Sequence, residues 1–108
     1  MTKQDVYAGE LAKLTEIFKD VEPAKAGLVA GLIEDAVFLL AENWELKKSI
    51  SVTGMVKIHP DHPAIQKPTE AAKQYLKNVN SYAVVIKALN GVLAKGVIEE
   101  DDELDEFE

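Results

Sequence analysis

The sequence contains no cysteine and no arginine, and only 6% of its 108 residues are aromatic. Without cysteine, neither disulfides nor thiolate metal sites can form. No apolar run is long enough to cross a bilayer, and the polar start MTKQDVYAGE lacks the apolar region of a signal peptide. We therefore expect a soluble protein of a reducing compartment that has no membrane partner.

The net charge of −7 is distributed unevenly along the chain. The last ten residues, EEDDELDEFE, carry eight acids and no base, whereas the rest carries twelve lysines against eleven acids. Residues 97–108 are therefore expected to be a disordered acidic tail. Residues 1–96 are expected to form one helical oligomerisation domain, because a chain this short buries a modest core and gains stability from self-association.

The periodicity of apolar residues predicts three helices and a mainly α fold. A first helix over Lys3 to Lys19 is separated from a second helix over Ala24 to Lys48 by Pro23. Proline suits the first turn of a helix, so it is expected to start the second one. A long third helix is expected from Thr69 to about Lys95, with Gly96 ending it.

Between the second and third helices the apolar period changes from helical to alternating, which predicts a short β-hairpin. A three-residue loop centred on Gly54 would pair Val52 with Val56. The same register pairs Ile50 with Ile58, and Gly54 supplies the positive φ that the turn requires. A connector before the third helix is marked by three prolines, which are Pro60, Pro63 and Pro68.

The third helix carries a continuous apolar seam whose members are spaced 4, 3, 4, 3 and 4 residues apart. Such spacing places all of them along one side of a helix. The seam is longer than a three-helix monomer needs, so we expect it to form the interface of a homo-oligomer. Its members are Tyr75, Val79, Tyr82, Ile86, Leu89 and Leu93.

Candidate metal and catalytic groups are few. His59, Asp61 and His62 are of types that bind zinc, but the intervening prolines prevent a regular helical spacing, and no cysteine or third histidine is available. Glu34 and Asp35 are adjacent in a helix and diverge by about 100°, so they cannot act as a facing pair. No glycine-rich phosphate loop is present. We expect no metal, no cofactor and no enzymatic activity.

Lysines gather around the hairpin, the connector and the start of the third helix. Lysine contacts phosphates as a mobile point charge, whereas arginine provides the planar fork that recognises guanine. We therefore expect weak phosphate contacts to double-stranded DNA rather than base-specific recognition. The lysines chosen for this role are Lys47, Lys48, Lys57, Lys67, Lys73 and Lys77.

The acidic tail has two interpretations that the sequence leaves open. One is a solubilising end. The other uses Leu104 and Phe107 as apolar anchors in a peptide that becomes ordered on a partner.

The order of these parts resembles the small terminase subunits of tailed phages and prophages. The resemblance runs from about Leu28 to Leu93. It consists of an apolar helix ending near NWELKKSI, the hairpin segment SVTGMVKI, and HPAIQKPTEAAKQYLKN at the start of the long helix. The acidic ending DELDEF is also similar to tails in that family.

The resemblance implies a non-enzymatic DNA-packaging component of the bacterial host cytoplasm. Such subunits assemble into rings, engage viral DNA and present it to the large terminase subunit, which supplies the ATPase and nuclease activities. The alternative from another class is a helical interaction or regulatory adaptor with no DNA-binding role.

Overall fold

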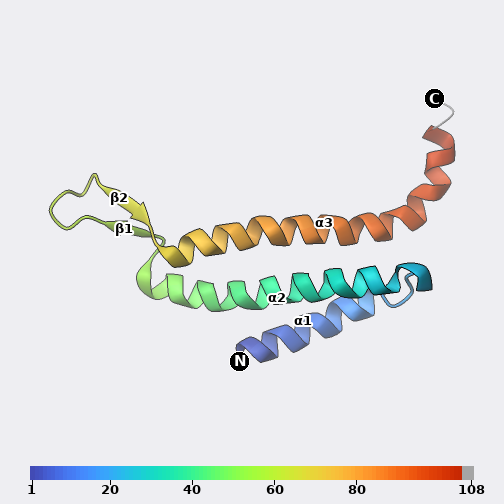
Figure 1. Cartoon of the computed structure of the whole chain (residues 1–108), viewed down its shortest axis with the longest axis horizontal. Coiled ribbons are helices and arrows are strands. Elements are labelled where there is room, and N and C mark those ends of the chain that lie inside the picture. Colours follow the sequence, from blue (N-terminus) through green and yellow to red (C-terminus); the bar gives the residue numbers. More distant parts are fainter. Residues whose placement is uncertain (106–108) are drawn as a thin grey trace.

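The computed structural model describes the backbone of residues 1–105 and the side chains of residues 1–94. Within these residues it contains three helices, with a two-stranded antiparallel hairpin between the second and the third (Figure 1). The prediction of a mainly α fold with a long third helix is confirmed. The elements are α1 (Lys3–Ile17), α2 (Pro23–Thr53), β1 (Val56–Ile58), β2 (Gln66–Pro68) and α3 (Glu70–Asp105).

Helix α1 begins with a reciprocal cap and is tied to α2 by an ion pair. The Asp5 N–H donates to Thr2 Oγ1 at 3.2 Å, and the Thr2 N–H donates to Asp5 Oδ2 at 2.8 Å. Lys3 Nζ lies 2.8 Å from Glu42 Oε1 of α2. This hydrogen bond and the Glu42 charge raise the pKa of the Lys3 ammonium above its ordinary value. Pro23 occupies the first turn of α2, as the sequence predicts.

Helix α2 continues five residues beyond the predicted end at Lys48. Ile50 and Val52 are therefore helical and do not form a strand. Gly54 follows the helix with a φ of 77°, and its N–H donates to the Ile50 carbonyl at 2.7 Å. The positive φ predicted for Gly54 is present, but it ends a helix instead of turning a hairpin.

The hairpin has a different register from the predicted one. Strand β1 pairs with β2, so the predicted partnerships of Val56 with Val52 and of Ile58 with Ile50 are wrong. The chain reverses through a longer loop, in which the His59 N–H donates to the Ile65 carbonyl at 2.9 Å. The observed pairs are Val56 with Pro68, Lys57 with Lys67, and Ile58 with Gln66.

Thr69 joins the hairpin to α3, and we call residues 54–69 the β-arm. The Thr69 side chain is buried, and its hydroxyl donates to the Gly54 carbonyl at 3.0 Å. The same hydroxyl accepts from the Ala72 N–H at 3.2 Å, so it caps the first turn of α3. The Thr69 N–H donates to the Met55 carbonyl at 2.9 Å. One residue thus closes the base of the β-arm and starts the long helix.

Helix α3 is described through Asp105, so it does not end at Gly96 as predicted. The backbone of residues 97–105 is helical, while residues 106–108 lie outside the described part of the chain. The side chains of the predicted anchors Leu104 and Phe107 also lie outside it.

The core lies where the three helices meet. Side chains of all three helices contribute to it, and burial there raises the pKa of the Tyr82 phenol above its ordinary value, with a further rise from the Glu10 carboxylate. The buried members of the core are Leu14, Phe18, Val29, Ile33, Ala36, Val37 and Leu89.

The molecule is elongated and thin (Figure 1). It extends 65 × 39 × 16 Å, and its Cα radius of gyration is 19.3 Å. A compact domain of this length has a radius of gyration of about 13 Å.

Candidate functional site

The fold brings the predicted DNA-binding lysines to one end of the molecule (Figure 1). The last turns of α2 lie beside the first turns of α3, since Lys47 Nζ is 5.9 Å from the centroid of the Tyr75 ring. The β-arm extends from the same end. We call this region the basic end, and its lysines are Lys47, Lys48, Lys57, Lys67, Lys73 and Lys77.

Charge is strongly polarised along the chain. Residues 45–77 hold six lysines against Glu45, Asp61 and Glu70, which gives a net charge of +3. The remaining residues hold six lysines against sixteen acids, a net charge of −10. A local positive field on an acidic protein attracts a polyanion to one end and repels it elsewhere. The sequence already contains this asymmetry, and the pairing of α2 with α3 brings Lys47 beside the start of α3.

Two of the six lysines face each other across the β-arm. Lys57 and Lys67 are direct partners in the ladder, and like charges in that position destabilise a hairpin. Neither Nζ atom has an ion pair or hydrogen bond within the described residues. An anion held between them would relieve the repulsion, so this pair is the part of the basic end best suited to an anion.

Three other lysines of the basic end, Lys47, Lys48 and Lys73, have local contacts. Lys48 Nζ lies 3.6 Å from the centroid of the Trp44 ring, a cation–π contact. Lys73 Nζ lies 3.2 Å from Glu70 Oε1. An exposed ion pair such as that of Lys73 contributes little to stability.

The apolar seam of α3 faces largely into the subunit itself. Leu89 is 1% exposed in the core, and Tyr82 and Ile86 pack against that core. Val79 and Leu93 remain 38% and 40% exposed, so they are the seam residues best placed to meet a neighbour. The 4-3 spacing correctly indicates a packed side of α3, but it carries no information about which chain supplies the partner.

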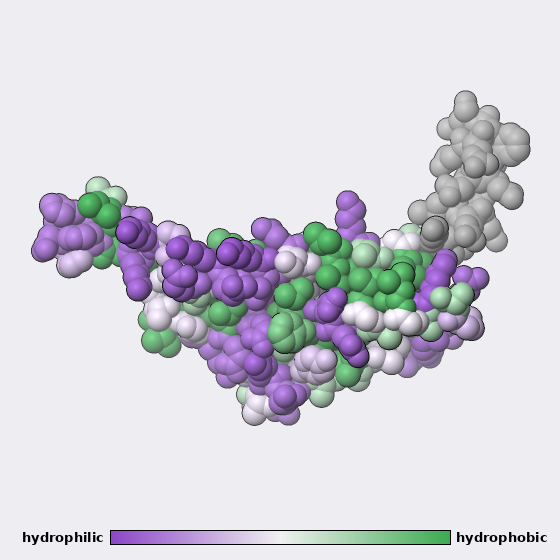
Figure 2. All heavy atoms as spheres, in the orientation of Figure 1, coloured by the Kyte–Doolittle hydropathy of each residue, from purple (hydrophilic) through white to green (hydrophobic). Residues whose placement is uncertain are grey.

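Two of the large apolar side chains of α2 are exposed, Leu28 at 63% and Phe38 at 56%. They do not form one apolar surface, because Leu28 shares a shallow hollow with Glu34 and Asp35, whereas Phe38 lines another hollow with residues of α1. A Cβ atom built at Gly27 or Gly31 would meet nothing within 4 Å. Leu28 and Phe38 are exposed because α1 and α3 cover only one side of α2. In Figure 2 the β-arm is largely hydrophilic, and hydrophobic side chains gather over the opposite half of the helices.

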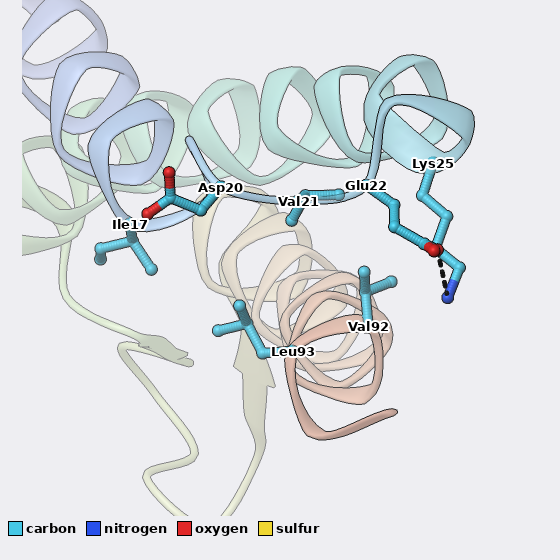
Figure 3. A pocket seen from close by; sticks show the side chains of 7 residues that line it. All are labelled: Ile17, Asp20, Val21, Glu22, Lys25, Val92 and Leu93. Atoms are coloured by element: carbon cyan, nitrogen blue, oxygen red, sulfur yellow. Dashed lines mark ion pairs between the residues drawn. The ribbon is translucent and has the colours of Figure 1, made fainter. Parts of the chain in front are cut away.

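A shallow hollow of about 300 Å³ lies where the turn between α1 and α2 meets α3 (Figure 3). Val92 and Leu93 of α3 point into it, and Glu22 and Lys25 form an ion pair of 3.5 Å at its rim. Its lining is mostly apolar. The lining residues are Ile17, Asp20, Val21, Glu22, Lys25, Val92 and Leu93.

The histidines of the β-arm organise its loop. His59 Nδ1 accepts the backbone N–H groups of Asp61 at 3.1 Å and His62 at 3.2 Å. The two imidazole centroids are 5.1 Å apart. Among the residues that the structure describes, no group of three or more potential ligands is placed to hold a metal ion. The histidine cluster thus has a structural role in closing the loop.

The described helices are all too polar or too short in apolar length to span a membrane. The basic end, the β-arm and the exposed apolar side chains of α2 and α3 are the features from which a function can be argued. Comparisons with protein-family models, with curated proteins and with solved structures find no match to this chain.

Proposed function

We propose that this chain is a non-catalytic small terminase subunit of a tailed phage or prophage. It assembles into a ring in the host cytoplasm, engages double-stranded viral DNA and presents it to the large terminase subunit. The observation that carries the proposal is the basic end, where six lysines are gathered on an otherwise acidic molecule. The resemblance of the segment from Leu28 to Leu93 to that family supports the same function.

The polarity of the charge supports DNA binding. One subunit offers a net charge of +3 at the basic end, which is weak by itself. A ring repeats this end around an axis, and linked weak contacts strengthen one another. Lysine and histidine are the only side chains of this protein that can carry a positive charge. The contacts with DNA are therefore made to phosphates and tolerate many base sequences.

Self-assembly is supported by exposed apolar side chains. Val79 and Leu93 of the α3 seam are 38% and 40% exposed, and Val56 and Ile58 of the β-arm are 44% and 58% exposed. Large apolar side chains left open on several elements suit contacts with neighbouring copies.

The test measures the native mass of the purified chain and its binding to a double-stranded DNA fragment over a salt series. We expect a closed assembly of many subunits whose affinity for DNA falls steeply with salt. A monomeric protein would contradict the ring. An assembly that binds no DNA at low salt would contradict the DNA-engaging role.

A helical adaptor without a DNA role is the second candidate. The observation in its favour is the apolar hollow between the α1–α2 turn and α3, which lies away from the basic end and suits a partner's apolar side chain. This function predicts a monomer or dimer that ignores DNA, so the same two measurements separate the candidates.

Deletion of residues 99–108 tests the acidic tail. We expect the truncated protein to lose binding to the large terminase subunit and to keep its affinity for DNA, since Leu104 and Phe107 supply anchors and the acids steer the approach. Helix α3 is 36 residues long, about 54 Å, and separates its acidic end from the basic end of the same subunit. Tighter DNA binding after deletion would instead indicate that the tail shields a neighbouring subunit's lysines. No change in either activity would reduce the tail to a solubilising end.

A further inference from the structure

The β-arm has no core of its own. Every residue from 51 to 68 is exposed, and its strands form three ladder pairs. A lone two-stranded hairpin is at best marginally stable in water. Only the base of the β-arm is held, where the buried Thr69 bonds to the carbonyls of Gly54 and Met55. Beyond this base, the stability of the ladder depends on its few cross-strand pairs.

The hydrogen bonds that flank the ladder fix the geometry of its central pair, Lys57 and Lys67. In an antiparallel ladder, pairs that exchange backbone hydrogen bonds alternate with pairs that do not. The bond from the His59 N–H to the Ile65 carbonyl lies two residues nearer the loop, and the bond from the Thr69 N–H lies two residues nearer the helices. The two lysines therefore form a bonded pair themselves. Their Cα atoms are about 5.5 Å apart, and their side chains lie on the same face of the strands.

The central pair opposes the ladder that holds it. Like charges directly opposite one another destabilise a strand pair. Within the described residues, neither ammonium of Lys57 and Lys67 has an ion pair or hydrogen bond. Asp61 is the one acid in the sequence of the β-arm, and it belongs to the loop and not to the ladder. The subunit itself thus leaves the repulsion between the two lysines in place.

A phosphodiester has the chemistry that this pair lacks. It carries one negative charge and two non-bridging oxygens, so each ammonium can donate a charge-assisted hydrogen bond to a separate oxygen. Two long lysine side chains that start about 5.5 Å apart can both reach one such group. The β-arm extends away from the helices, which leaves its lysines open to the backbone of a long polymer (Figure 1).

We propose that a phosphodiester of the DNA backbone binds between Lys57 and Lys67, and that this binding orders the β-arm. In the free subunit the ladder opens and closes while the helices stay folded, because no residue of the β-arm belongs to the core. Only the closed ladder holds the two ammoniums side by side, so DNA shifts the β-arm toward its closed form. The inference rests on the DNA-binding role in the proposed function and names the contact that controls the β-arm.

Charge reversal of one lysine tests the repulsion without DNA. Lys57→Glu converts the like-charged pair into an oppositely charged pair, which should slow amide exchange in the β-arm about fivefold. Hydrogen–deuterium exchange of the full chain, read by mass spectrometry on a peptide that covers residues 54–69, measures the rate. Salt screens both pairs, so added salt should slow this exchange in the wild type and speed it in the variant.

Lys77→Glu is the matched control for this variant. It makes the same change in net charge at an exposed position of α3 outside the ladder, so it should leave exchange of the β-arm peptide unaltered. Equal rates in the wild type and Lys57→Glu would overturn the inference, because repulsion would then not limit the ladder. Equal slowing by both variants would also overturn it, since the β-arm would then respond to overall charge.

A DNA duplex at low salt tests the coupling itself. At a concentration ten times the dissociation constant, DNA should slow exchange of the wild-type β-arm peptide about tenfold. The same peptide of Lys57→Glu, which has lost one of the two ammoniums, should not respond. A wild type that binds DNA by fluorescence anisotropy without this slowing would overturn the inference and leave the proposed function intact, whereas a wild type that binds no DNA would overturn both. Slowing by a poly-glutamate peptide but not by DNA would overturn the assignment to phosphate in favour of an acidic protein segment.

Discussion

Replacement of Leu89 with alanine is expected to lower the free energy of unfolding by about 3 kcal/mol. Leu89 is 1% exposed and is the α3 residue fully buried in the shared core. Its truncation removes apolar contacts and leaves a cavity among side chains of α1 and α2, which cannot collapse without moving a helix. Urea denaturation followed by circular dichroism measures the change.

Leu93→Ala is the matched control, one helical turn further along the same side of α3. Leu93 is 40% exposed, so its loss should cost about 1 kcal/mol or less. Equal costs at the two positions would mean that α3 does not pack on α2 as described.

The Ile86→Asp substitution, which the seam suggests as a test of assembly, would place a charge against the subunit's own core. Its main effect would be unfolding.

Removal of the opposed lysines on the β-arm should produce the second large effect. We expect Lys57→Ala with Lys67→Ala to make the plot of log affinity for DNA against log salt shallower by about 1.8 per subunit in contact, because each phosphate contact contributes about 0.9 to the slope. The fold should be unaffected, since both side chains are exposed. Fluorescence anisotropy with a DNA duplex over a salt series measures the slope.

The control removes two lysines from a different part of the molecule. Lys13 and Lys19 belong to α1 and its C-terminal turn, and lie 3.9 Å from Glu10 Oε1 and 2.6 Å from Glu16 Oε1. Lys13→Ala with Lys19→Ala changes the net charge by the same amount and should leave the slope unchanged. If both pairs reduce the slope equally, DNA responds to overall charge and the basic end is not a binding surface.

Local features of the fold could be predicted from the sequence because they depend on residues only a few positions apart. Pro23 starts α2 since its fixed φ suits a first helical turn, and Gly54 adopts a positive φ since it lacks a Cβ atom. The periodicity of apolar side chains likewise predicts each helix and the side of α3 that packs. The gathering of lysines near the hairpin is also visible in the sequence.

The tertiary structure decided whatever depends on partners distant in the chain. Ile50 and Val52 fit a strand pattern, but the i to i−4 hydrogen bonds of α2 continue through them to the cap at Gly54. Strand β1 then pairs with a segment that follows a long loop, and no local residue pattern specifies that register. Leu89 belongs to the subunit core and Leu28 to its surface for the same reason. A sequence shows that a side chain is apolar, whereas the arrangement of the other helices decides whether that side chain is covered.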